Sequence, residues 1–293
     1  MIMFLKKFPS PRFLLLTSAV LLGMAATHSA SAQTVLIDFG PNDNTNGQTT
    51  PAGTASNAPG LASTGQYWNN FTNTGAANNV PNGSTLANLV TTANVATTIG
   101  ITTINGAGAG GAYTGLQSNG YLNGGLTNPN SNLLGNFAVG TVTGDYFFVA
   151  TNTGGAVATA TFRISGLDVN RTYDFSLFGT RTTANLRQTI YSVTDRTGIA
   201  KTFNLQTSGP GAGSAANPTG NDNKLAVLAG LVPNLNGTLD LVLSAGVTTT
   251  AEGFAYIGGM QIVAVPEPST WAAVLVMGAL LVVVSRRRQA VRD

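Results

Sequence analysis

The sequence predicts an all-β protein whose central part folds as a β-sandwich, and three observations lead to this prediction. Short runs rich in β-branched and aromatic residues recur along the chain, separated by glycine and asparagine, which favour turns. Tyr173, Phe175 and Leu177 alternate with polar residues, as in a strand with one buried face. Only 9% of the residues are charged. Strands at fairly regular spacing therefore indicate two packed sheets.

The expected strands follow one another from the first segment after residue 33 to the last apolar run before residue 265. They are residues 34–39, 97–104, 145–150, 156–164, 172–180, 188–194, 201–205, 224–232, 238–244 and 254–263. Residues 165–170 are predicted to form a hairpin connection, and residues 233–237 a turn. Residues 84–93 fit a short helical turn or a strand. Residues 41–81 are predicted to be loops pinned by Tyr67, Trp68 and Phe71.

The N-terminal segment has the pattern of a secretory signal peptide. Basic residues at 6, 7 and 12 precede an apolar run over residues 13–26, and small residues follow it. Ala30 and Ala32 match the small-residue rule for cleavage by signal peptidase, which leaves Gln33 as the new N-terminus. A membrane anchor is the alternative, but it needs roughly 20 apolar residues. We therefore expect residues 1–32, a signal helix, to be removed on export.

The C-terminal segment, residues 265–293, has the pattern of a membrane-inserted tail. An apolar run over residues 271–284 lies between a proline-rich motif and a basic triplet. These flanking residues are Pro266, Glu267, Pro268, Arg286, Arg287 and Arg288. The prolines end any preceding structure, and the arginines favour the cytoplasmic side of the membrane. The sequence predicts a transmembrane helix that leaves the preceding domain outside the cell.

Residues 265–288 resemble the PEP-CTERM sorting signal in motif, spacing and position. The resemblance implies an exosortase-type membrane protease as a partner, with removal of the tail near the Pro-Glu-Pro motif. Proteins with this signal are typical of Gram-negative bacteria that make exopolysaccharide and biofilm. The expected location is first the inner membrane and then the cell surface or extracellular matrix. The alternative is an ordinary membrane anchor.

The segment between the two ends, residues 33–264, is predicted to be a single extracytoplasmic domain of low charge. It holds seven basic and nine acidic residues, a net charge of −2, so we expect no nucleic-acid partner. It has no cysteine for disulfides. The only histidine of the chain, His28, lies in the predicted signal peptide. The absence of His and Cys from the domain excludes Ser-His-Asp and Cys-His catalysis and histidine or thiolate zinc sites.

The absence of His and Cys does not exclude catalysis by carboxylates, because glycoside hydrolysis needs only two positioned acids. The acids of the domain are scattered, and each fits a turn or strand position. Residues 42–47 resemble a calcium loop, but the twelfth position, where the helix-loop-helix site has glutamate, is Gly53. We therefore predict no catalytic residue, no metal and no cofactor.

Residues 36–40, 67–70, 173–179 and 254–262 together resemble the galactose-binding-type jelly-roll domains found in many exported proteins. A fibronectin-like sandwich is the alternative, because residues 164–177 also resemble its hairpin with a late tyrosine.

The hypothesis for glycan contact concerns four consecutive residues, Tyr67, Trp68, Asn69 and Asn70. An exposed aromatic ring stacks on the C–H face of a sugar, and amides bond its hydroxyls. In the alternative, Trp68 anchors a long loop on the core. For the arginines of the domain two roles stay open, bonds to sugar hydroxyls or pairing with strand acids such as Asp174 or Asp195. These arginines are Arg163, Arg171, Arg181, Arg187 and Arg196.

Three functions stay open at this point. The first is a non-catalytic surface or matrix protein that binds carbohydrate, with exopolysaccharide as a partner. The second is a carboxylate-based glycan hydrolase or lyase, and the third is a self-assembling structural subunit of the cell surface.

Overall fold

The computed structural model describes residues 33–41, 59–72, 79–107, 115–119, 123–150, 159–250 and 253–265, together with Gly278. Gln33–Val265 form one compact unit. The predicted signal peptide and the sorting tail beyond residue 265 lie outside the described residues, apart from Gly278. Within the ranges given above, no helix is both long enough and apolar enough to span a bilayer.

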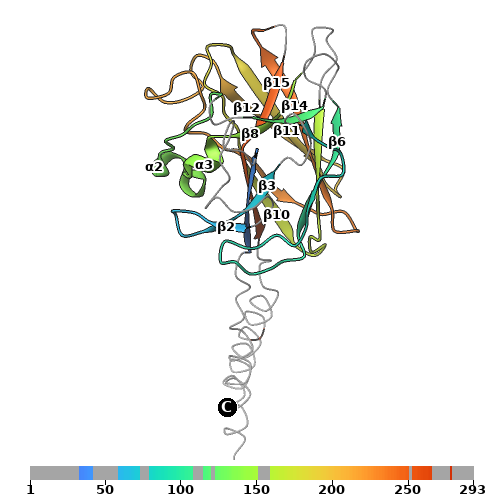
Figure 1. Cartoon of the computed structure of the whole chain (residues 1–293). Helices are drawn as coiled ribbons and strands as arrows, with labels where there is room; N and C mark the ends of the chain where they lie inside the picture. The colour runs from blue at the N-terminus through green and yellow to red at the C-terminus, as the bar shows by residue number, and fades with distance from the viewer. Residues whose placement is uncertain are drawn as a thin grey trace, which may run out of the picture. The chain divides into compact units, whose positions relative to one another are not determined.

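Three β-sheets make up this unit (Figure 1). The first sheet consists, in spatial order, of β13 (Ala226–Leu231), β10 (Thr172–Phe178), β16 (Gly259–Val265), β1 (Thr34–Gly40), β3 (Tyr67–Thr72) and β2 (Pro59–Leu61). The second consists of β12 (Ala200–Ser208), β11 (Arg187–Thr194), β14 (Leu239–Thr248), β9 (Thr159–Ser165), β6 (Gly100–Ala107) and β5 (Thr85–Leu86). The third, smaller sheet consists of β15 (Phe254–Ile257), β8 (Tyr146–Ala150), β7 (Leu116–Asn119) and β4 (Asn79–Val80). Described strand pairs are antiparallel except that of β1 with β3.

The main hydrophobic core is formed by side chains of all three sheets. Alternate residues of each strand point to one face, so β10 contributes Phe175 and Leu177 to this core, as its sequence pattern predicted. Phe39 makes edge-to-face contacts with Phe147 and Phe162, at centroid distances of 5.6 and 5.3 Å. Such aromatic pairs add to the free energy gained from apolar burial. The all-β sandwich predicted from the sequence is confirmed, with a third, smaller sheet that the sequence did not predict.

A short helical segment covers the other side of β1. It consists of α2 (Ser131–Leu134), the 3₁₀ turn η2 (Gly135–Phe137) and α3 (Gly140–Thr143). Figure 1 shows α2 and α3 together at one flank of the sheets. Phe137 and Val142 pack with Leu36 of β1 and Trp68 of β3 in a second buried cluster. These helical turns were not predicted from the sequence, because each is only three or four residues long.

Several strand predictions are confirmed within a few residues, and others need correction. The segment predicted as one strand over residues 254–263 forms β15 and β16, which meet at Gly258 and belong to different sheets. Residues 41–81, predicted as loops, contain β2, β3 and β4. Residues 84–93 contain the two-residue strand β5 and no helix. Strands this short carry too few residues to show an alternating pattern.

The hairpin predicted at residues 165–170 is wrong. β9 lies in the second sheet and β10 in the first, so the connection crosses from one sheet to the other. Gly166 adopts φ of 72°, and a Cβ there would lie 1.9 Å from the carbonyl oxygen of Thr98. The Tyr173 hydroxyl accepts a hydrogen bond from the Asp168 amide at 2.8 Å. The hairpin on which the fibronectin-like alternative depended is therefore absent from this connection.

Candidate functional site

The residues predicted to contact glycan lie on β3, inside the protein. Trp68 is fully buried and packs edge-to-face on Phe137, at a centroid distance of 5.8 Å. Asn69 and Asn70 are also buried, while Tyr67 is half-buried. The prediction of an exposed stacking ring at Trp68 is thus wrong, and the alternative, a tryptophan that anchors its segment on the core, describes the structure. The cause is that both faces of β3 are covered, one by the main core and one by the helical segment.

Asn69 has a structural role that uses most of its hydrogen-bonding capacity. Its Nδ2 donates to the carbonyl oxygens of Leu36 at 2.8 Å and Val90 at 2.9 Å. Its Oδ1 accepts from the amide of Val90 at 2.8 Å. The side chain therefore ties β3 to β1 and to the loop at residue 90, and it presents no free amide to a sugar.

The residues predicted for targeting are mostly outside the described ranges. These are Ala30, Ala32, Pro266, Glu267, Pro268, Arg286, Arg287 and Arg288. Gln33, the predicted mature N-terminus, is half-buried, and its carbonyl accepts a hydrogen bond from the Ala264 amide at 2.9 Å. The first and last strands of the domain, β1 and β16, are therefore neighbours.

Four of the five arginines of the domain divide into two groups by their partners, while Arg196 donates to the Val169 carbonyl oxygen at 3.4 Å. Arg163 forms a bidentate pair with Asp240, both bonds being 2.8 Å long, and Arg171 lies 3.4 Å from Asp168. Arg181 and Arg187 instead bond tyrosine hydroxyls, and neither forms an ion pair within the described residues. The expected arginine pairs with Asp174 and Asp195 are absent from the described part of the chain.

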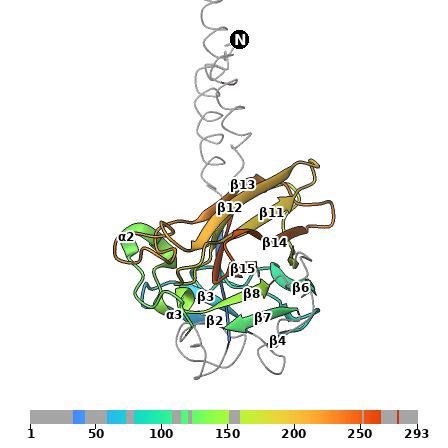
Figure 2. The same cartoon turned by 90° about the horizontal axis from the view of Figure 1, so that it is seen from above.

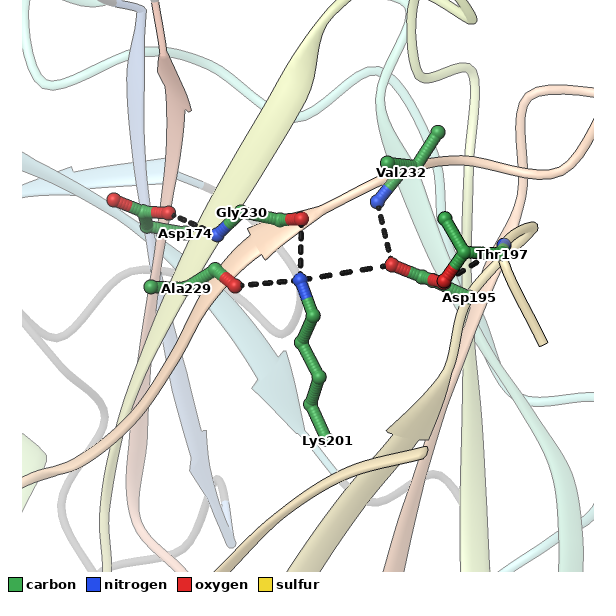
Figure 3. A network of polar contacts seen from close by, with 7 residues as sticks. All are labelled: Asp174, Asp195, Thr197, Lys201, Ala229, Gly230 and Val232. Carbon is green, nitrogen blue, oxygen red and sulfur yellow. Dashed lines mark hydrogen bonds and ion pairs between the residues drawn. The ribbon is translucent and has the colours of Figure 1, made fainter. Parts of the chain in front are cut away.

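Asp174 and Asp195 belong to a polar network with Lys201, shown in Figure 3. Lys201 Nζ donates to the carbonyl oxygens of Ala229, at 2.7 Å, and Gly230, and lies 3.6 Å from Asp195 Oδ2. Asp195 also accepts bonds from Val232 and Thr197. Burial acts to raise the pKa of Asp195, but these hydrogen bonds and the charge of Lys201 outweigh it and lower the pKa. Because the network bonds its own backbone, we assign it a role in stability.

A different group of residues forms the candidate binding site, on the third sheet. In β8 and β15, Phe147, Val149, Ala255 and Ile257 point into the main core. The alternate residues of these strands form a separate buried cluster on the opposite face, whose rings, Tyr146, Phe148, Phe254 and Tyr256, are 0–6% exposed. Figure 2 shows β8 beside β7 and β4, the strands that extend this sheet. We call these four rings with Arg181 and Arg187 the aromatic–arginine site.

Amide side chains lie in register beside these rings. Gln117 of β7 is directly opposite Phe148, which is opposite Tyr256. Asn79 of β4 is opposite Gln117. Since residues directly opposite in an antiparallel pair share a face, Tyr256, Phe148, Gln117 and Asn79 form one row across the sheet. In this row the two rings are buried, while the amides of Gln117 and Asn79 are half-buried and can donate hydrogen bonds at the surface.

Arg187 enters the site through an irregularity in the sheet. The register of β11 shifts at Arg187 against both β12 and β14, as in a β-bulge, which redirects a side chain. The guanidinium lies over the ring of Phe254, 4.0 Å from its centroid, and Nη1 donates to the Tyr256 hydroxyl. Arg187 itself is only 8% exposed.

Arg181 follows β10 and is half-buried. Its Nη1 donates to the Tyr146 hydroxyl at 3.0 Å, and that hydroxyl donates to the carbonyl oxygen of Asn123 at 3.0 Å. The next residue, Thr182, bonds the Gly124 carbonyl at 2.6 Å, which fixes this segment against the loop before α2. The two arginines therefore approach the rings from two separate elements.

The tyrosines of the site stay neutral at physiological pH. Burial raises the pKa of Tyr146 and of Tyr256, and the opposing influence of the two arginines does not cancel this. The phenol groups act as hydrogen-bonding groups and do not supply negative charge. The site is thus aromatic, rich in donors, and positively charged.

No metal centre is evident in the described ranges. No group of three or more His, Asp or Glu side chains is placed to hold a metal ion there. Asp38 and Asp145 are both buried, and the Asp145 carboxylate occupies the space beside Gly40, where a Cβ would lie 1.8 Å from it. Burial favours a structural role for these two acids.

The sequence contained partial signals of the aromatic–arginine site. The run over residues 145–150 is conspicuously aromatic, and Phe254 and Tyr256 lie in a predicted strand. The sequence did not show that these strands pair, or that Arg181 and Arg187 come to the same face.

Comparison with known proteins leaves the family of this chain open. No protein-family model matches it, and no curated protein is similar to it. Among solved structures, the module TmCBM61, determined in complex with β-1,4-galactotriose, is 11% identical and aligns over 41% of this chain and 70% of its own length, with a TM-score of 0.26. The enzymatically active domain of tailspike protein 4 of bacteriophage CBA120 is 17% identical over 51% of this chain and 17% of its own length, with a TM-score of 0.26. At this level of similarity, neither structure identifies what this chain binds.

Proposed function

We propose that this chain is a non-catalytic carbohydrate-binding protein of the bacterial cell surface or extracellular matrix. The observation that carries the proposal is the aromatic–arginine site, in which four rings and two arginines share one face of a small sheet with amide side chains. The four rings are only 0–6% exposed, so the half-buried Arg181, Gln117 and Asn79 supply the accessible contacts, as donors for hydroxyl and acidic groups. No arrangement of described side chains supports a hydrolase as directly.

Export and sorting form the second part of the proposal, and they rest on the sequence. The basic and apolar N-terminus, the Ala30 and Ala32 cleavage pattern, and the tail from Pro266 to Arg288 support passage through signal peptidase and an exosortase-type protease. The pairing of β1 with β16 places the first and last residues of the domain next to each other in the first sheet, so both proposed cleavage sites adjoin paired strands.

The test is binding of the full chain, purified in detergent micelles, to an array of bacterial and plant polysaccharides. We expect retention on at least one polysaccharide and loss of that retention in Arg181→Ala. A matched control is Arg196→Ala, which removes an exposed arginine outside the site. Thermal unfolding of each variant separates loss of binding from loss of folding. Absence of binding across the array, or equal loss in both variants, would refute the proposal.

A further inference from the structure

One end of the domain is defined by the first residue of β1 and the last residue of β16. Thr34 is opposite Val263, and Val265 is opposite Thr172, the first residue of β10. The connection over residues 166–171 ends directly before Thr172 and therefore lies at this end too. We call it the exit end, because the chain continues from Val265 into the predicted sorting tail.

Backbone hydrogen bonds bring three further loops to the exit end. These loops cover residues 91–96, 195–199 and 233–237. The bonds, each 3.0 Å long, run from the Thr92 amide to the Thr34 carbonyl, from the Leu167 amide to the Gly237 carbonyl, and from the Arg196 amide to the Val232 carbonyl. The loops are thus fixed next to the first and last strands.

Large apolar side chains are exposed on these three loops. Leu235 is 81% exposed, Ile199 64% and Val95 59%. Among the described residues, only one other large apolar side chain is as exposed, Val247 at 60%. It lies on β14, eight residues beyond Leu239, which is about 26 Å along a strand. Single exposed apolar residues are ordinary, but several gathered in one place are typical of an interaction surface.

The four loops of the exit end carry no net charge. Their charged residues are Asp168, Arg171, Asp195 and Arg196. Arg171 lies 3.4 Å from Asp168, and Asp195 is buried next to Lys201. Such a surface is neither repelled by anionic headgroups nor dependent on them, so its contacts depend on the apolar side chains.

We propose that the exit end is a membrane-contact surface, in which Val95, Ile199 and Leu235 touch the lipid and hold the domain against the bilayer until the tail is removed. The inference rests on the proposed export and sorting. Five residues, 266–270, separate Val265 from the apolar run that begins at residue 271. A chain spans at most about 3.6 Å per residue, so an inserted run keeps the exit end within about 20 Å of the bilayer. A short tether makes even weak contacts effective.

The test uses the absence of cysteine from the chain. Val95→Cys, Ile199→Cys and Leu235→Cys each accept one environment-sensitive fluorophore, and the labelled full chain is placed in phosphatidylcholine vesicles with a spin-labelled quenching lipid. We expect quenching at all three positions. Val247→Cys, equally exposed but at the other end of β14, should stay unquenched. Phosphatidylglycerol or added salt should change the quenching little.

A second measurement tests the energetic role of one apolar side chain. Leu235→Ser should lower the equilibrium constant for lipid contact, read from the label at position 95, by about tenfold, as expected for the loss of one buried leucine. Val247→Ser is the control and should leave this constant unchanged. Both variants should keep the Tm of the parent, because both side chains are exposed.

A label in the predicted tail, at Ala279→Cys, separates failure of the inference from failure of the proposed sorting. Quenching at position 279 without quenching in the loops would refute the membrane-contact surface and leave tail insertion intact. No quenching at position 279 would refute the tail insertion on which both rest. Equal quenching at position 247, or a loop signal that needs no quenching lipid and grows with protein concentration, would also overturn the inference, since it would indicate unspecific adsorption or contact between copies of the chain.

Discussion

Replacement of Asn69 by leucine tests the conclusion that this residue holds the fold together and does not contact a ligand. Leucine has a similar volume, but it removes the three hydrogen bonds to Leu36 and Val90. The Val90 amide loses its described partner, and an orphaned buried group costs about 1–3 kcal/mol. With about 1 kcal/mol for each of the two carbonyl bonds, we expect a loss of about 3–5 kcal/mol. That is a large part of the usual stability of a domain.

The assay is urea unfolding followed by fluorescence of the buried Trp68. With a slope of about 3 kcal/mol/M for a protein of this size, the midpoint should fall by roughly 1–2 M. Asn204→Leu is the control, because Asn204 is an exposed residue of β12, and its midpoint should change little. A loss below about 1 kcal/mol in Asn69→Leu, on the scale of one ordinary hydrogen bond, would show that the three bonds do not act as described.

Three further predictions concern the support of the site, the polar network and the two ends of the chain. Gly179→Ala should destabilise the protein, because a Cβ there would lie 2.6 Å from both the Tyr191 hydroxyl and the Tyr256 carbonyl oxygen; thermal unfolding checks this, and an unchanged Tm would contradict it. Asp195→Asn should destabilise the protein by about 1–3 kcal/mol at neutral pH. The folded-state pKa of Asp195 lies below the unfolded value of about 3.9. The difference in unfolding free energy between parent and variant should therefore persist above that pH and shrink as the pH falls through the folded pKa. A free-energy difference that does not change between about pH 7 and pH 2 would refute this. Intact-mass spectrometry of the protein from its native host should show loss of both ends, near Gln33 and near Pro266, whereas a membrane form that keeps Arg286–Arg288 would mean a tethered protein.

The candidate site could be predicted from the sequence only in part. The aromatic character of residues 146–148 and of Phe254 and Tyr256 is visible in the chain. Their pairing is not, because β8 and β15 are about a hundred residues apart in sequence and become neighbours only in the folded chain. The contacts of Arg187 also depend on the register shift of β11 at this residue, which no local sequence pattern predicts.

Trp68 shows why the solvent exposure of an aromatic side chain could not be predicted from the sequence. A Tyr-Trp pair followed by two asparagines fits a sugar-binding loop and a buried strand equally well. The structure decides between them through Phe137 and Val142, which come from a helical segment far along the chain and cover the indole. Whether an aromatic residue is buried depends on such distant contacts.

The sequence by itself determined the all-β class, most strand positions in the second half of the domain, the low charge, and the exclusion of histidine and cysteine chemistry from residues 33–264. These depend on composition and on the two-residue period of a strand, which are local properties. Only the tertiary structure decided that the connection from β9 to β10 crosses between sheets, that Trp68 and Asn69 belong to the interior, and that Arg181 and Arg187 meet four aromatic rings without a described carboxylate. The reason is physical: alternation places a side chain on one face of its strand, but strand pairing and the packing of distant segments decide what that face contacts.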